Sequence, residues 1–184
     1  RRFSTLDTLG GAPEADVLQL WSGLGYYSRA RNLQKGARQI DGGFPSDYNE
    51  IRKLPGVGDY TAAAIASIAF GAPRAAVDGN VIRVVARVAN ETGDIASAAI
   101  RQRLSSTANS LLDTKNPGTF NQAMMELGAT LCLPRNPQCL TCPVTALCEA
   151  RKQGTQHEVP VKARRTNTIR IERTLLIVKR RGRI

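Results

Sequence analysis

The stretch KLPGVGDYTAAAI, residues 53–65, places two glycines between two segments with helical sequence patterns. Gly56 and Gly58 lie two positions apart, and Gly58 comes just before a segment of small residues. A helix N-terminus carries about half a positive charge and unpaired N–H groups, so this turn can hold a phosphate without any side chain. Such contacts hold a nucleic-acid backbone rather than its bases. The alternative is an ordinary helix–helix turn. The residues concerned are Leu54, Gly56, Val57 and Gly58.

On both sides of this turn, apolar residues recur at helical spacing. Helices are expected over residues 13–21, 28–40, 46–54, 59–70, 79–90, 96–113 and 119–132. Pro13 suits a first helical position, and Ser46 is the expected cap of the third helix. Residues 153–168 are expected to form a linker, and a strand is expected to begin near Ile169. The predicted fold class is therefore all-α, followed by the start of a β element.

Asp78 lies between an apolar segment and the helix expected over residues 79–90. Aspartate is a favoured N-cap, so stability alone could explain its presence. The same position also suits chemistry. A carboxylate beside Ala75–Val77 is partly desolvated and is kept ionised by the helix dipole. Such a group can stabilise a cation that forms on a sugar ring. The residues alone leave both explanations open.

The cysteines are clustered in one segment near the C-terminal end. The spacing is C-x6-C-x2-C-x5-C, formed by Cys132, Cys139, Cys142 and Cys148. The start of the chain has no apolar core typical of a signal peptide, so disulfides are not expected and the thiols are interpreted as metal ligands. A set of four thiolates suits either zinc or an iron–sulfur cluster, and the spacing does not separate the two.

The charge of the chain favours a polyanionic partner. The net charge is +11, and residues 160–184 hold nine Lys and Arg against one acid, Glu172. A solvated basic tail would give the same numbers.

The single histidine, His157, lies in a polar stretch, which excludes triad hydrolases and zinc deaminases of the H-x-E type. No stretch approaches the roughly 18 apolar residues of a membrane span.

Taken together, the hairpin LPGVG, Asp78 and the cysteine spacing resemble the helix-hairpin-helix DNA glycosylase superfamily over about residues 11–152. The resemblance implies that fold, with a [4Fe–4S] cluster on the four cysteines. It also implies that the cluster shapes a loop that contacts DNA and takes no part in bond breaking. Asp59 stands where relatives often carry a basic residue or proline, which implies slightly weaker phosphate binding.

Two features select a branch of this superfamily. Endonuclease III-like members carry a lysine in the hairpin helix where this chain has Tyr60, which cannot form a Schiff base. VDGNV, GLGYYSRARNL and FNQAMMELGA resemble the adenine DNA glycosylases of the MutY type. That resemblance implies a monofunctional enzyme that removes adenine opposite 8-oxoguanine or guanine in duplex DNA. It gives catalytic roles to Asp78, Tyr60 and Asn80, and places Tyr26 beside the opposing 8-oxoguanine.

The resemblance also predicts the organisation of the chain. A helical module with the hairpin is expected over residues 1–75, a cluster module over 76–152, and a linker with the first strand of a Nudix-like domain over 153–184. Both ends are expected to be truncated. The family's general-acid glutamate would precede residue 1, so we expect this chain alone to bind DNA and catalyse poorly. The protein is expected to be a monomer in the cytoplasm, associated with the nucleoid if the source is a bacterium. No membrane partner is expected.

Three other functions remain open from the sequence. Another mismatch glycosylase of the superfamily, such as a thymine-specific enzyme, would use the same hairpin and aspartate. A non-catalytic DNA-binding module would use only the hairpin. A zinc-bound structural module would use only the cysteines.

Overall fold

A computed structural model of the protein describes residues 2–163 and 172–174, and all regular elements in these ranges are helical. The α-helices are α1 (Leu6–Gly11), α2 (Glu14–Leu20), α3 (Tyr27–Gln39), α4 (Tyr48–Lys53), α5 (Asp59–Phe70), α6 (Gly79–Val88), α7 (Ala98–Leu111), α8 (Pro117–Thr130) and α9 (Glu149–Gln153). Two short 3-10 helices, η1 (Cys139–Thr141) and η2 (Thr145–Leu147), lie in the cysteine segment. Of the helices described, none has the length and apolar character needed to cross a membrane.

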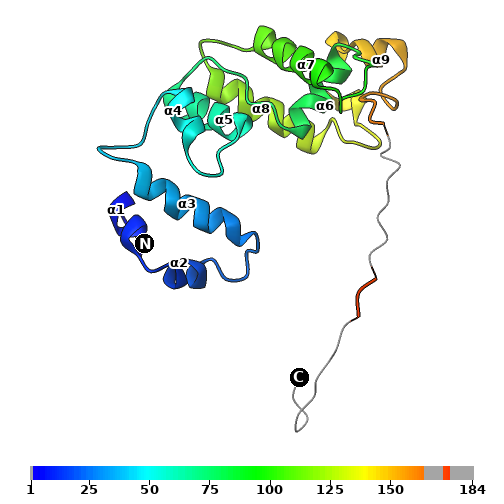
Figure 1. Cartoon of the computed structure of the whole chain (residues 1–184). Coiled ribbons are helices and arrows are strands. Elements are labelled where there is room, and N and C mark those ends of the chain that lie inside the picture. Colours follow the sequence, from blue (N-terminus) through cyan, green and yellow to red (C-terminus); the bar gives the residue numbers. More distant parts are fainter. Residues whose placement is uncertain (1, 164–171, 175–184) are drawn as a thin grey trace.

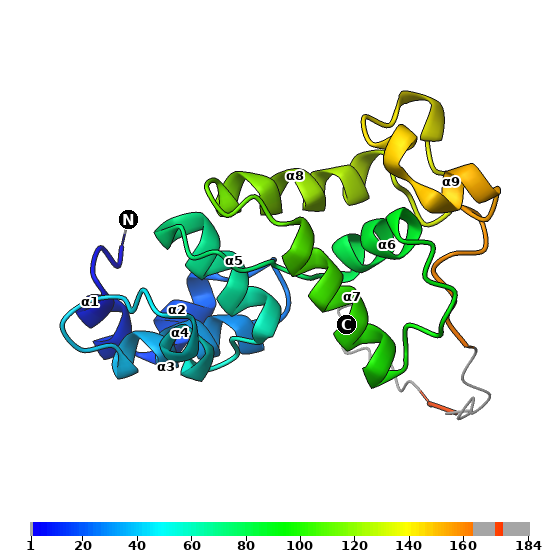
Figure 2. The same ribbon diagram turned by 90° about the horizontal axis from the view of Figure 1, so that it is seen from above.

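The helices form three groups, each with its own apolar cluster. Helices α1, α2 and α3 pack together at one end, and α6, α7 and α9 lie at the other, with the α4–α5 hairpin between them (Figures 1 and 2). Helix α8 contacts both α5 and α6, so it joins the hairpin to the second end. Ile51 is buried between α4 and α5, and Val85 and Leu104 are buried between α6 and α7.

The expected all-α class is confirmed, and several boundaries agree closely. Helix α5 covers the expected residues 59–70, and Val81, Val84 and Val85 form the buried stripe of α6. The expected cap Ser46 is wrong. Helix α4 starts one residue later, and Asp47 caps it by accepting from the N–H groups of Asn49 and Glu50 at 2.8 and 3.2 Å. A carboxylate is the better acceptor there, because the helix N-terminus is positively charged.

Two helices were not expected from the sequence. Helix α1 has only six residues and is held by a capping box in which Thr5 and Thr8 bond each other's backbone N–H. The usual signature has Glu or Gln in the second position, so this box is hard to detect from sequence. Helix α9 has five residues, too few to show apolar periodicity.

The described part of the expected linker is docked on the second group of helices. Val159 is buried against α6 and α7, and the N–H of Ile95 donates to the carbonyl of Val161 at 2.9 Å. The strand expected from Ile169 lies, apart from residues 172–174, outside the described residues. The division into modules at residues 75 and 152 stays a prediction.

Candidate functional site

The turn between α4 and α5 has the geometry of a backbone anion site. Gly56 has a φ of +75°, in the left-handed region that favours glycine, and a Cβ there would collide with the Asn32 side chain. Gly58 is the N-cap of α5, and no side chain caps this helix. The first-turn N–H groups of α5 are therefore open to an outside acceptor. This geometry suits a phosphate held by backbone N–H groups, and phosphate binding by Leu54–Gly58 stays a prediction.

An ion pair braces this turn from the side of α4. The Asp59 carboxylate accepts from Arg52 Nε at 2.6 Å and from the Tyr48 hydroxyl at 3.3 Å. A second nitrogen of Arg52 donates to the carbonyl of Val57 at 3.2 Å. The hydrogen bond and charge of Arg52 lower the pKa of Asp59. An ionised carboxylate therefore stands at the first residue of α5.

Asp78 is the N-cap of α6 and is half-buried. Its Oδ1 accepts from the N–H of Val81 at 2.7 Å, and its Oδ2 accepts from Asn80 Nδ2 at 3.0 Å. The preceding segment is fixed by Asn121 of α8, which is 2% exposed and accepts from the N–H of Ala76 at 3.0 Å. The resemblance gave catalytic roles to both Asp78 and Asn80, and the structure brings these two residues into contact.

Hydrogen bonds continue from Asn80 to the cysteine segment through Arg83. A terminal nitrogen of Arg83 donates to Asn80 Oδ1 at 2.8 Å and to the carbonyl of Gly128 at 2.6 Å. Its Nε donates to the carbonyl of Cys132 at 2.7 Å. Burial lowers the pKa of Arg83, and the neighbouring Cys132 partly opposes that effect. The position of the Asp78 carboxylate is thus tied to the first cysteine.

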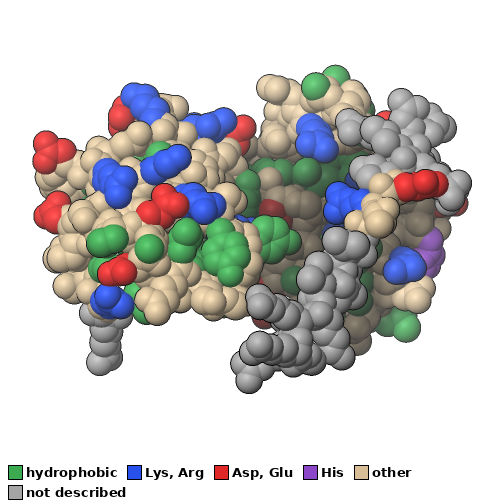
Figure 3. Space-filling view, turned by 60° about the horizontal axis from the view of Figure 1, so that its bottom comes forward, with side chains coloured by type: hydrophobic (Ala, Val, Ile, Leu, Met, Phe, Trp, Pro, Cys, Tyr) green, Lys and Arg blue, Asp and Glu red, His purple; other side chains and the backbone are tan. Residues whose placement is uncertain are grey.

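Tyr60 lies on the first turn of α5 and contacts α8. Its hydroxyl donates to Met125 Sδ at 3.2 Å, and its ring lines a surface hollow together with Val77, the neighbour of Asp78. The contacts described for Tyr60 do not include a hydrogen bond to Asp78. Figure 3 shows a face of the molecule that is hollowed between two lobes, with hydrophobic side chains in the hollow and Lys and Arg beside it.

Tyr26 is held in an exposed and unusual conformation. It has a φ of 45° and a ψ of 47°, left-handed values that are uncommon for a non-glycine residue, and it is 75% exposed. Trp21 Nε1 fixes the loop by donating to the carbonyl of Gly25 at 3.0 Å. The Arg29 guanidinium lies 5.0 Å from the centre of the Tyr26 ring. The loop presents this aromatic ring to solvent, where it is available to a partner.

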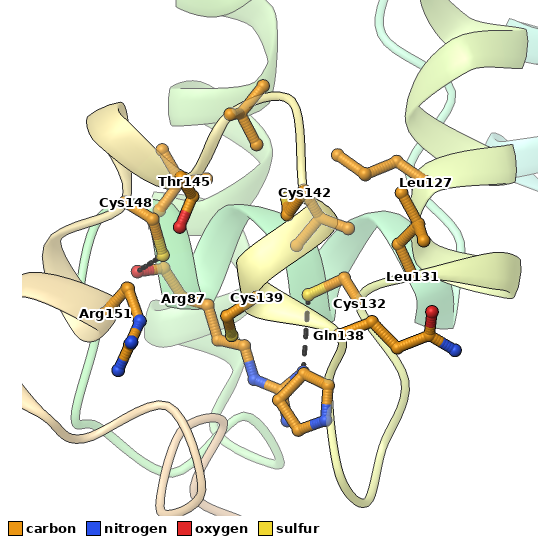
Figure 4. A pocket seen from close by; sticks show the side chains of 14 residues that line it. Arg87, Leu127, Leu131, Cys132, Gln138, Cys139, Cys142, Thr145, Cys148 and Arg151 are labelled. Carbon is orange, nitrogen blue, oxygen red and sulfur yellow. Dashed lines mark hydrogen bonds between the residues drawn. The ribbon is translucent and has the colours of Figure 1, made fainter.

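The four cysteines line one apolar hollow (Figure 4). All four are half-buried and free of disulfides, and they share the hollow with Val84, Leu127, Leu131 and Val144. Burial raises the pKa of the Cys148 thiol. Within the described ranges, no three potential ligands come together as they would around a single metal ion. Four free thiols that line one hollow form a set of sulfur ligands that suits either zinc or an iron–sulfur cluster.

The comparisons with known proteins agree with this geometry. The family model for "HhH-GPD superfamily base excision DNA repair protein" matches residues 1–109. The chain belongs to this superfamily. Among solved structures, this HhH-GPD chain resembles a non-covalent endonuclease III–DNA complex with a TM-score of 0.68 and 29% identity, covering 84% of this chain and 73% of the other. It also resembles a thermostable thymine-DNA glycosylase with a TM-score of 0.70 and 27% identity, covering 83% and 72%.

Curated relatives of this HhH-GPD chain are named adenine DNA glycosylases. The human protein is 48% identical over 164 residues, which cover 86% of this chain and 30% of the human protein. The protein of Buchnera aphidicola subsp. Baizongia pistaciae is 38% identical over 173 residues, covering 92% of this chain and 49% of the relative. The chain therefore spans less than half the length of either curated relative.

Sequence reasoning missed several residues that hold the site. Arg83 and Arg87 are four positions apart on α6, where Arg87 is buried and Arg83 is half-buried. Two arginines spaced by one helical turn among the valines of this helix were a detectable signal. Asn121 and Met125 lie in a segment whose sequence gave them no individual role. Their contacts with Ala76 and Tyr60 join residues 45 and 65 positions apart, a separation that no local pattern reveals.

Proposed function

We propose that this protein is a monofunctional DNA glycosylase that removes adenine mispaired with 8-oxoguanine or guanine. The single observation that supports this most is the Asp78 carboxylate. It is held at a helix N-terminus by Val81 and Asn80, and its neighbour Val77 lines the same surface hollow as Tyr60 of the hairpin helix α5. The name shared by the curated relatives, adenine DNA glycosylase, supports the choice of base.

In the proposed reaction the target adenine leaves the duplex, because its glycosidic bond cannot be reached within the base stack. As the bond to adenine breaks, positive charge develops on the sugar. Asp78 would stabilise that cation through its carboxylate, and its hydrogen bonds with Val81 and Asn80 keep it oriented before the reaction begins. Water would then add its oxygen to the sugar carbon, the released adenine would gain a proton, and an abasic site would remain.

The protein would leave the DNA strand intact after the base is released. Strand cleavage by covalent attack needs an amine that forms a Schiff base. The first turn of α5 carries Asp59, Tyr60 and Thr61, none of which has an amine. Tyr60 would instead form part of the wall of the base pocket, held by its contact with Met125.

Two surfaces would hold the duplex. The open N-terminus of α5 and the Gly56–Gly58 turn would bind a backbone phosphate without reading sequence. The exposed Tyr26 would enter the duplex beside the base opposite adenine. We propose that the protein acts on this DNA as a monomer.

We propose that the four cysteines hold a [4Fe–4S] cluster. Such a cluster would fix the loop of residues 132–148 in place, which is a structural role. When bound, it would also be capable of electron transfer. Zinc remains the alternative. The two metals differ in colour and in metal content, so absorption in the visible range with iron in the protein would identify the cluster.

A panel of mispairs tests the proposed substrate. Single-turnover base release is measured, with the native N-terminus in place, on duplexes that carry A opposite 8-oxoguanine, G or T, and T opposite G. We expect release only with 8-oxoguanine or G opposite adenine, and strand breaks only after alkali. Release of thymine from T opposite G would favour the activity named for the thymine-DNA glycosylase structure that this chain resembles. Binding without any release would favour a DNA-binding module.

Asp59→Asn should strengthen DNA binding. The change removes a negative charge at the first residue of α5 and frees Arg52, while the exposed pair that is lost contributes little to stability. We expect about a 3- to 10-fold tighter Kd at low salt, with a smaller gain at high salt. Fluorescence anisotropy with a labelled duplex measures this. Asp113→Asn, which removes an exposed carboxylate after α7, is the matched control, and an equal gain in both variants would contradict the prediction.

A further inference from the structure

Arg87 is a buried cation for which the described residues provide no carboxylate. It is 2% exposed, and none of the described ion pairs includes it. A buried charge is unfavourable unless an opposite charge or polar partners compensate it. Carbonyl groups satisfy its hydrogen bonds but leave its net positive charge unbalanced. The negative charge that would balance Arg87 must therefore come from another group nearby.

The guanidinium points at the cysteine hollow (Figure 4). One terminal nitrogen donates to Cys132 Sγ at 3.3 Å and to the carbonyl of Leu133 at 2.7 Å. The other donates to the carbonyl of Pro134 at 3.3 Å, and Nε donates to the carbonyl of Val159 at 2.8 Å. These contacts fix the loop that follows the first cysteine and attach it to Val159, in the segment that follows α9.

The backbone of Arg87 reaches the other end of the same loop. The thiol of Cys148 donates to the carbonyl of Arg87 at 3.4 Å. One residue of α6 thus contacts the first and the last of the four cysteines, although it lies outside the cysteine segment. The hollow has apolar walls, which strengthen the interaction between a cation and nearby thiolates.

We infer that Arg87 is a positioning residue that balances the charge of the cysteine thiolates and favours the reduced state of the cluster they hold. The inference rests on the proposed [4Fe–4S] cluster. Thiolates bound to iron carry negative charge, and one added electron increases it. A charged N–H···S hydrogen bond stabilises the more negative state, so the potential is higher with Arg87 than without it. The same charge balance slows loss of the cluster.

Three variants test this inference. Arg87→Gln removes the charge, Arg87→Lys keeps it, and Arg103→Gln is the matched control, because Arg103 pairs with Glu91 at 3.0 Å and is 64% exposed. Iron per chain, the half-life of visible absorption in excess chelator, and the reduction potential by voltammetry are measured. For Arg87→Gln we expect at least about a tenfold shorter half-life. We also expect the reduction potential to fall by about 59 mV. For one electron, this corresponds to a tenfold loss in the stability of the reduced form relative to the oxidised form. Arg87→Lys should retain most of the parent's iron.

The outcomes separate this inference from the cluster itself. A parent that holds zinc or no iron overturns both. A parent with a cluster, together with an Arg87→Gln protein of equal half-life and potential, overturns only the role of Arg87. Equal loss of iron from the Gln and Lys variants also overturns it. If neither variant folds, pulsed EPR on the reduced parent with ¹⁵N-arginine decides. Coupling that persists in an Arg151→Gln protein is expected, because Arg151 lines the same hollow, and its absence contradicts the inference.

Discussion

Asp78→Asn should abolish base release while DNA binding is retained. Asparagine caps helices as well as aspartate does, so its side-chain oxygen can still accept from the N–H of Val81 and α6 should form normally. The variant loses the negative charge that would face the developing cation, together with the hydrogen bond that Oδ2 accepts from Asn80 Nδ2. Removal of one preorganised stabilising group typically costs on the order of 10²–10³ in rate, and we expect a loss of at least 10³ for a full charge. Single-turnover release from a duplex with A opposite 8-oxoguanine measures this.

Asp94→Asn is the control for that experiment. Asp94 lies in the loop before α7, accepts from the N–H groups of Ala96 and Ala163, and is remote in sequence from the hairpin and from Asp78. Its substitution changes charge by the same amount and should leave release unchanged. The prediction fails if Asp78→Asn keeps more than about a tenth of the parent rate with equal DNA affinity, a loss too small for a group that stabilises the transition state.

Cys142→Ser should remove most of the bound iron and disorganise the cysteine segment. Cys142 follows η1, and the hollow it lines is bordered by α6 and α8 as well as by the loop. Serine is a poor ligand for iron, and the binding energy of a metal site contributes directly to folding. We expect at least about a tenfold fall in iron per chain, a lower Tm and weaker duplex binding. Metal analysis, thermal unfolding by circular dichroism and anisotropy measure these three effects.

Leu140→Ser is the matched control for the cysteine variant. Leu140 lies on the same turn, between Cys139 and Cys142, and its side chain is 89% exposed. Serine at this position alters the turn without removing a ligand or a buried contact. The control should keep its iron and its Tm. A Cys142→Ser protein with full iron content would show that the four thiols do not act as one set of ligands.

Local patterns in the sequence predicted those parts of the site that depend on near neighbours. The hairpin requires glycine at a positive φ and a helix directly after it, and both appear within LPGVGDY. Asp78 caps the helix that begins at the next residue, so a short stretch was enough to place it. The cysteines were expected to form one set because of their spacing. A helix cap also depends on near neighbours, but the sequence pattern did not show whether Ser46 or Asp47 would cap α4. Because α4 begins at Tyr48, Asp47 is the cap.

The tertiary structure decided the links between these parts. Arg83 connects its near neighbour Asn80 to Cys132, which is 49 positions from Arg83. Arg87 connects Cys132 to Val159, which are 45 and 72 positions from Arg87. Whether a buried arginine is stabilised depends on carbonyl groups and thiols that come from other segments of the chain. Sequence alone therefore determined the hairpin, the capping aspartate and the grouping of the four cysteines. Only packing decided that the arginines of α6, the helix that Asp78 caps, hold the cysteine segment, because hydrogen bonds between distant segments have no local signature.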